Sequence, residues 1–467
     1  MPTAFLNDLF ATLSERGRAL LGRPKGPIKG DDLVELGENL LSRQGEASGV
    51  ALAAAIIGNY DAAPPPARLT FLTALADRFG PDMGQVKSAL KAVEKDASPA
   101  NVQTLHRATE ARRQELLRRL NLAPGGTAAL VRMREELLDH LPARPDLRGV
   151  DGDFAHMFST WFNRGFLVLR HIDWTTPANI LEKIIRYEAV HAIQDWDDLR
   201  NRLEPSDRRC YGFFHPQLAD DPLIFVEVAL TTGIPDAIAP LLDTSRKPIA
   251  AEEATTAVFY SISNTQRGLG GVSFGNFLIK QVVEELKREL PQLKTFVTLS
   301  PAPGFARWLK KERAKDDSDF LDAALRDQLK LLDEPGWQDN AGTREALRKP
   351  MMQLAASYYL SARNAAGRPV DPVARFHLGN GARLEAIDYL GDASPKGMAQ
   401  AHGFMVNYLY ALDDIEKNHE AFVEQGEVAA SAAVKKLLRA NGGRDRAAAV
   451  KNGKEAKKDA AEKGAVA

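Results

Sequence analysis

The chain has 467 residues, which is enough for roughly two or three domains and a sizeable core. Its 61 Lys and Arg residues balance 62 Asp and Glu residues to a net charge of −1, which argues against a general nucleic-acid binder. The single cysteine, Cys210, excludes an internal disulfide and a multi-cysteine zinc site, and no apolar run approaches the ~18 residues that a membrane span needs.

The first third of the chain has a helical pattern. Leu33, Leu36 and Leu40 recur at i, i+3 and i+7, as the buried face of a helix requires. Three consecutive prolines at 64–66 cannot lie inside a helix and separate two of them. Residues 1–22 are amphipathic, and Asp8 and Glu15 count against a cleaved organellar presequence, because such peptides are poor in acids. We expect an all-α helical bundle over residues 1–145.

The pattern of the sequence then changes from helical to mixed. Pro142, Pro145, Gly149 and Gly152 predict a linker, after which short β-type runs alternate with helices. Strands are expected at 166–169, 223–230, 257–262 and 295–299, and helices at 320–332, 344–362 and 406–424. This alternation predicts an α/β or α+β domain over residues 150–430. The tail, 439–467, contains almost no large apolar residue and is expected to be disordered.

A glycine-rich turn, NTQRGLGGVSFG at 264–275, lies between an expected strand and an expected helix. Glycines allow positive φ and a close approach to a ligand, and a helix N-terminus offers free N–H groups to a phosphate. A dinucleotide fingerprint needs a third glycine where Ser273 stands, and the Gly-Lys-Ser/Thr of a Walker loop is absent. The acetyltransferase-type loop, R/Q-x-x-G-x-G/A, is approached by residues 267–272, with the last position altered. The turn therefore favours the pyrophosphate of coenzyme A, and the alternative is a tightly packed helix N-terminus.

One serine and several histidines are candidates for chemistry. Ser300 follows the strand expected at 295–299 and precedes two prolines that fix the next turn, so its hydroxyl could bond a substrate carboxylate or carbonyl. It does not lie in a G-x-S-x-G nucleophile elbow, and capping of the next helix is the alternative role. His377 stands beside a Gly/Asn turn that could place it at a cleft, whereas His191 is expected in a helix. No H-x-x-x-H or H-E-x-x-H spacing supports a metal site.

At these residues the sequence resembles the malonyl-CoA decarboxylase family. The resemblance follows the family's order through RCYGFFH at 209–215, PLIFVEVALT at 222–231, GLGGVSFGNFLIKQVV at 268–283, LSPAPGF at 299–305, FHLGNGA at 376–382 and MVNYLY at 405–410. It covers most of the chain after the expected linker, and the helical N-terminal part fits it too.

The resemblance implies a multidomain chain, in which the helical bundle mediates oligomerisation and an acetyltransferase-like α/β domain carries catalysis. It places the catalytic serine at Ser300 and the catalytic histidine at His377, with Tyr410 as a supporting residue. The family's CoA-contacting loop falls on Gly270, Gly271, Val272, Ser273, Phe274, Gly275 and Asn276.

The implied activity is the conversion of malonyl-CoA to acetyl-CoA and CO2 in fatty acid metabolism, with neither a metal nor an organic cofactor. Ser300 would orient the carboxylate or bond the developing enolate, and His377 would protonate C2. Two alternatives stay open: an acyl-CoA N-acyltransferase on the same fold, and a non-catalytic CoA-binding scaffold. The resemblance also implies a homotetramer in the cytoplasm or, alternatively, the mitochondrial matrix, with no nucleic-acid or membrane partner.

Overall fold

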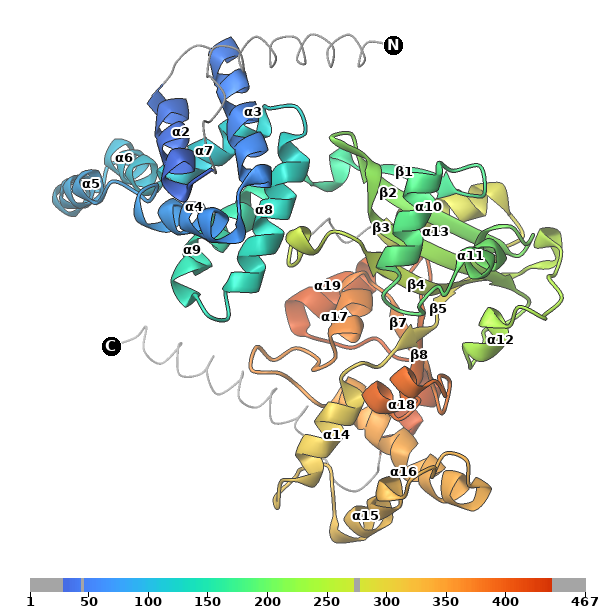
Figure 1. Cartoon of the computed structure of the whole chain (residues 1–467). Coiled ribbons are helices and arrows are strands. Elements are labelled where there is room, and N and C mark those ends of the chain that lie inside the picture. The colour runs from blue at the N-terminus through green and yellow to red at the C-terminus, as the bar shows by residue number, and fades with distance from the viewer. Residues whose placement is uncertain (1–27, 43–45, 273–277, 439–467) are drawn as a thin grey trace.

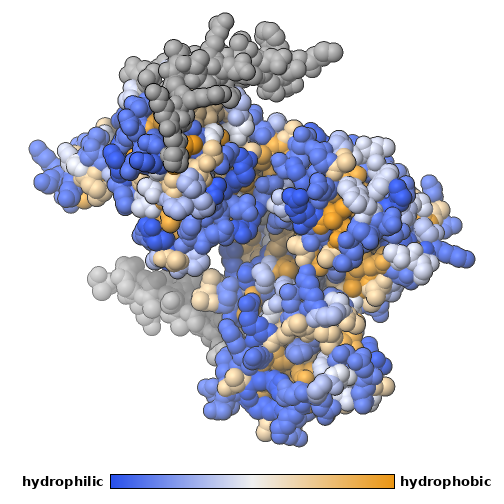
Figure 2. Space-filling view, viewed as in Figure 1, coloured by the Kyte–Doolittle hydropathy of each residue, from blue (hydrophilic) through white to orange (hydrophobic). Residues whose placement is uncertain are grey.

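The computed structural model of the chain describes residues 28–42, 46–272 and 278–438. Its elements form two parts that lie side by side in Figure 1: an N-terminal group of helices, coloured blue to cyan, and a larger part built on one sheet. The predicted order, a helical bundle followed by an α/β domain, is confirmed. Hydrophilic residues cover most of the face seen in Figure 2. No helix of the described residues is long and apolar enough to cross a membrane.

The N-terminal part is all helical because its apolar residues recur at helical spacing and meet in one core. Leu33, Phe71, Leu116 and Leu130 are fully buried at its centre. Its helices are α2 Gly30–Ser42, α3 Glu46–Ala62, α4 Pro65–Asp77, α5 Met83–Lys95, α6 Pro99–Thr109, α7 Arg112–Asn121, α8 Gly126–His140 and α9 Arg148–Trp161.

Helix α9 occupies much of the segment that was expected to be a linker, so that prediction was wrong. Val150, Phe154 and Phe158 lie on one face of α9 and are fully buried. The burial of three large side chains outweighs the cost of about 1 kcal/mol that each of the two glycines imposes on a helix. The helical part therefore extends to Trp161.

The second part is built on an eight-stranded sheet with the order β1-β2-β3-β4-β5-β8-β6, in which β7 also pairs with β8. The strands β4 and β5 run parallel, and every other pairing between named strands of the described residues is antiparallel. The strands are β1 Val168–Ile172, β2 Arg208–His215, β3 Leu218–Thr231, β4 Thr256–Asn264, β5 Thr295–Thr298, β6 Ser300–Pro301, β7 Arg383–Asp388 and β8 Met405–Leu409.

Helices cover both faces of this sheet, which explains why its central strands are continuously apolar. On β3, Phe225 packs against α10 and α11, whereas Val226 and Val228 face the main core that α13 joins. The helices of this part are α10 Ala178–Tyr187, α11 Trp196–Leu203, α12 Ala239–Leu242, α13 Leu278–Glu289, α14 Phe305–Arg313, α15 Ala323–Gln328, α16 Ala341–Leu360, α17 Pro372–Gly379, α18 Pro395–Ala401, α19 Ile415–Gln425 and α20 Ala432–Lys436.

The prediction of one long helix over 406–424 was wrong, because a strand and a separate helix share that segment. Met405 packs on one face of the sheet, whereas Val406 and Tyr408 pack on the other, as the period of a strand requires. The helix α19 begins only at Ile415. The expected disordered tail, 439–467, lies outside the described residues.

Candidate active site

The parallel pair β4–β5 places two of the predicted features at the same edge of the sheet. The ladder between these strands ends at Phe259 and Thr298. Beyond that point β4 continues to Asn264 and enters the glycine turn, whereas the chain after β5 turns to pair Ser300 with Val406 of β8. In α/β sheets, ligands bind outside the carboxyl ends of parallel strands. The serine and the glycine turn therefore leave the sheet where a ligand site is expected.

His377 reaches the same place from the last turn of α17. The carboxylate of Asp371 caps this helix by accepting the N–H of Ala374 at 2.8 Å, and Pro372 occupies its first turn. After the helix, Gly381 has φ of +80°, and a Cβ there would overlap the carbonyl oxygen of Ile415 in α19. A cap at one end and a glycine turn at the other thus fix the orientation of α17.

Three predicted residues form one hydrogen-bonded chain. The Ser300 hydroxyl lies 3.1 Å from Nε2 of His377, and the Tyr410 hydroxyl lies 2.8 Å from Nδ1 of the same ring. Two further side chains belong to the site. Ser300 donates to Oγ1 of Thr298 at 2.9 Å, and the ring of Tyr408 stacks on His377 with centroids 4.6 Å apart. All five side chains are buried.

One arrangement of protons along this chain fits all of these hydrogen bonds. Because the Ser300 hydroxyl donates to Thr298, its oxygen is free to accept the Nε2–H of His377. Nδ1 of His377 then accepts the hydroxyl of Tyr410. Burial lowers the pKa of His377 to about 3 and raises the pKa of Tyr410, so both groups are neutral near pH 7. The chain is thus a neutral relay that can pass a proton toward Ser300.

A contact between α16 and the turn after β6 joins the serine to the histidine helix. The Tyr358 hydroxyl donates to Asp371 at 3.0 Å, and the same carboxylate caps α17. A Cβ at Gly304 would overlap that hydroxyl oxygen, so only glycine allows the turn after Ser300 to approach this closely. The glycine of the LSPAPGF motif therefore serves close packing beside the serine.

The glycine turn is described only as far as Val272. Gly268 and Leu269 are buried in a short 3-10 turn, η4 (Arg267–Leu269), and Gly271 has φ of +76°, which requires glycine. Val272 is buried, and Gly270 follows η4. The rest of the predicted CoA loop, Ser273, Phe274, Gly275 and Asn276, lies outside the described residues. Phosphate binding at this turn stays a prediction.

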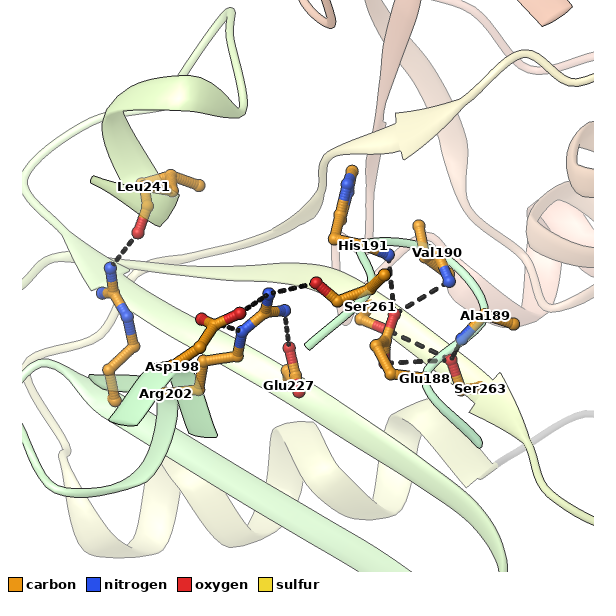
Figure 3. Close-up of polar contacts among 12 residues, drawn as sticks. Glu188, Ala189, Val190, His191, Asp198, Arg202, Glu227, Leu241, Ser261 and Ser263 are labelled. Carbon is orange, nitrogen blue, oxygen red and sulfur yellow. Dashed lines mark hydrogen bonds and ion pairs between the residues drawn. The ribbon is translucent and has the colours of Figure 1, made fainter. Parts of the chain in front are cut away.

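Figure 3 shows a buried polar cluster that the sequence analysis did not predict, on the sheet face opposite the main core. Glu227 on β3 is fully buried and accepts a bond from Arg202 of α11 at 3.0 Å. Glu188, which follows α10, accepts bonds from Ser261 and Ser263 of β4. Burial and the nearby Glu188 raise the pKa of Glu227 to about 7, against the attraction of Arg202.

This cluster ties the loop between α10 and α11 to the sheet. His191 lies in this loop, so its prediction as a helical residue was wrong. Glu188 accepts the backbone N–H of His191 at 2.8 Å. The Lys396 ammonium of α18 holds the same loop through the carbonyl oxygen of Val190 at 2.9 Å. The loop lines a cavity of about 250 Å³ together with Pro301. The cluster thereby fixes one wall of a cavity that adjoins the strand of the catalytic serine candidate.

We expect the buried neutral state of His377 to make stability depend on pH. The folded pKa of about 3 lies below the ordinary value of 6.5, so the unfolded chain binds a proton that the folded chain does not. This contribution to stability is complete above pH about 6.5 and is lost as the pH falls toward 3. Urea unfolding at pH 7.5 and 5.5 should therefore show a smaller loss of stability for His377→Gln than for the natural chain. Equal losses would contradict a buried neutral histidine.

The fold and the site together describe a class of protein: a helical bundle joined to a mixed-sheet domain, with a buried serine–histidine–tyrosine hydrogen-bond chain at the carboxyl edge of a parallel strand pair. A family model for the malonyl-CoA decarboxylase C-terminal domain matches residues 165–448, and one for the N-terminal domain matches residues 79–162. The chain belongs to the malonyl-CoA decarboxylase family, whose members are carboxy-lyases.

Individual relatives agree with this assignment. Mitochondrial malonyl-CoA decarboxylase of Anser anser anser is 37% identical over 78% of this chain and 78% of its own length. The one from Rattus norvegicus is 36% identical over 79% of this chain and 82% of its own. A crystal structure of malonyl-CoA decarboxylase from Rhodopseudomonas palustris is 65% identical, covers 88% of this chain and 100% of that chain, and has a TM-score of 0.85.

Proposed function

We propose that this chain converts malonyl-CoA to acetyl-CoA and CO2 through the Ser300–His377–Tyr410 relay. The observation that carries the proposal is the continuous chain of hydrogen bonds from Tyr410 through both ring nitrogens of His377 to the Ser300 hydroxyl. The proposal also draws on the family to which the chain belongs.

In the proposed reaction, the bond between C2 and the carboxylate carbon of the malonyl group breaks. CO2 leaves, and the electron pair passes to C2 and the thioester oxygen as an enolate. The Ser300 hydroxyl donates to that developing oxyanion by turning away from Thr298. His377 gives its Nε2–H to C2, and the Tyr410 hydroxyl passes a proton to Nδ1. Nδ1 then returns this proton to the Tyr410 oxygen and solvent supplies one proton to Nε2, so atoms and charge balance and the starting tautomer of His377 is restored.

The low pKa of His377 suits this direction of proton transfer. A buried imidazole with a pKa of about 3 is a weak base, whereas an enolate is a strong one and takes a proton even from a neutral donor. A thioester carbonyl that itself accepts the electron pair needs no metal or organic cofactor.

The same pKa disfavours the acyltransferase alternative. An N-acyltransferase must remove a proton from an amine, and burial lowers the pKa of His377, which makes the ring a weaker base for that task. The other alternative, a CoA-binding scaffold, gives no reason for a buried hydrogen-bond chain through Ser300, His377 and Tyr410. The tetramer, the oligomerisation role of the helical part and the cellular compartment stay predictions that rest on the family resemblance.

The purified chain should release CO2 and acetyl-CoA from malonyl-CoA without any amine. We expect Ser300→Ala to lower kcat by ~10²–10³-fold, the usual cost of one lost donor to an oxyanion. Thr298→Val is the comparison variant, because it keeps the Ser300 hydroxyl and removes the acceptor that this hydroxyl shares with the Tyr408 backbone N–H, and it should change kcat much less. Product that forms only with an amine would identify an acyltransferase, and CoA binding without any turnover would identify a scaffold.

A further inference from the structure

We propose that Arg134, on helix α8 of the N-terminal part, is a positioning residue that holds the glycine turn in the shape that receives the nucleotide end of the substrate. The inference deepens the proposed function and rests on it for the identity of that ligand. Arg134 itself would not touch the substrate. It would act through the backbone of the segment from Gly268 to Val272.

The guanidinium of Arg134 joins the two parts of the chain at the turn. Its Nη1 donates to the carbonyl oxygen of Gly268 at 2.8 Å and to that of Gly270 at 3.0 Å. Its Nε donates to Asp151 of α9 at 2.8 Å, and only 4% of the Arg134 side chain is exposed. Asp151 thus orients the guanidinium, and one nitrogen fixes two carbonyl groups of the turn.

The turn is pressed against α8 at the same place. A Cβ at Gly268 would overlap the carbonyl oxygen of Val131, so glycine is required for this approach. The exposed guanidinium of Arg267 pairs with Asp139, one turn beyond Arg134 on α8. The helix therefore contacts the turn through the backbone of Gly268 and through side chains on either side of it.

These contacts determine where the backbone of the turn points. The N–H groups of Leu269, Gly270 and Val272 bond within the turn at 3.0, 2.9 and 3.0 Å. With the carbonyl groups of Gly268 and Gly270 bound to Arg134, the segment from Gly268 to Val272 has little freedom left. These three N–H groups hold the shape of the turn rather than a phosphate. Because that shape sets the directions of the N–H groups that the turn still offers, loosening the two carbonyl groups should weaken the hold on a pyrophosphate.

The decisive experiment compares two thioesters in the full-length chain. Malonyl-CoA carries the nucleotide, whereas malonyl-N-acetylcysteamine has the same malonyl thioester without it. For Arg134→Lys, which keeps the charge but loses the forked geometry, we expect KM for malonyl-CoA to rise by ~10–100-fold. The kcat for malonyl-CoA, and kcat/KM for malonyl-N-acetylcysteamine, should stay within about threefold of the natural values.

Arg113→Lys is the matched control. Arg113 on α7 is also mostly buried, pairs with Asp153 at 2.5 Å and donates to the carbonyl oxygen of Leu75 at 3.2 Å. All these contacts lie inside the helical part, so its loss should cost stability without raising KM. If Arg134→Lys fails to fold, Asp151→Asn weakens the orientation of Arg134 and should raise KM for malonyl-CoA by ~3–10-fold.

Three kinetic outcomes would overturn the proposal: equal losses with both thioesters, an unchanged KM for malonyl-CoA, or an equal rise in KM for Arg113→Lys. Failure of the proposed function is recognised separately, because the affinity for free coenzyme A can be measured by calorimetry without any turnover. If the natural chain binds coenzyme A but does not decarboxylate malonyl-CoA, a weaker affinity in Arg134→Lys still supports the role of Arg134. A natural chain that does not bind coenzyme A would overturn it.

Discussion

Replacement of His377 by glutamine is expected to lower kcat for malonyl-CoA by ~10²–10⁴-fold, the usual contribution of a positioned proton donor. Glutamine can still bond to Ser300 or Tyr410, but it cannot give up one proton while it accepts another. The affinity for coenzyme A should stay nearly unchanged, since the ring lies between Ser300 and Tyr410 rather than at the glycine turn. Steady-state kinetics and calorimetry with coenzyme A measure the two quantities.

His215→Gln is a suitable control for this variant. The ring of His215 is also buried, packs 4.9 Å from the ring of Phe162, and has a pKa that burial lowers. It lies at the end of β2 and has no contact with the relay among the described residues. We expect the control to lose some stability and to keep its kcat. A fully active His377→Gln enzyme would show that another group protonates C2.

Replacement of Arg202 by methionine is expected to destabilise the fold by about 3–5 kcal/mol, because it leaves a fully buried carboxylate without its cation. The loss should be larger at pH 8.5 than at pH 5.5. With Arg202 in place the pKa of Glu227 is already raised to about 7, and removal of the cation should raise it further. Below these values Glu227 is protonated and needs no cation, so the penalty appears as the pH rises through them.

Arg200→Met is the control for Arg202→Met, because it makes the same substitution on the same helix, α11. Arg200 is about half exposed, pairs with Glu204 at 3.5 Å and stacks on Trp174, so its loss should cost no more than about 1 kcal/mol. Chemical unfolding of both variants at the two pH values gives the comparison. A penalty for Arg202→Met that is small, or that does not grow with pH, would contradict the role assigned to this ion pair.

The parts of the fold that the sequence predicts are those with a repeated local pattern. The leucines around Leu33 mark the buried face of α2, and the apolar run at 223–230 marks β3, which is covered on both faces. The segment 406–424 was misread because β8 has only five residues and gives little room for an alternating pattern to show. The glycines at 149 and 152 suggested a linker, whereas the segment is helical because Val150, Phe154 and Phe158 are buried against other helices. That burial cannot be seen in the local sequence.

In the candidate site, too, some residues could be predicted from the sequence and others could not. Ser300 and His377 stand 77 positions apart, and only the family pattern linked them before the structure brought them to 3.1 Å. Thr298 and Tyr408 could have been found from strand spacing, since each lies two residues before a predicted site residue and so shares its face. Contacts such as that of Arg134 with Gly268 leave no local signal at all, because they join elements that are distant in the sequence.

The contact between α8 and the glycine turn affects whether the α/β part can be separated from the helical part. The two family models meet between residues 162 and 165, which looks like a natural place to cut the chain. A fragment that begins there would keep Ser300 and His377 but lose α8 and with it Arg134. The carbonyl groups of Gly268 and Gly270 would then lose their donor. Exchange of the α/β part between relatives would therefore succeed only if α8 travelled with it.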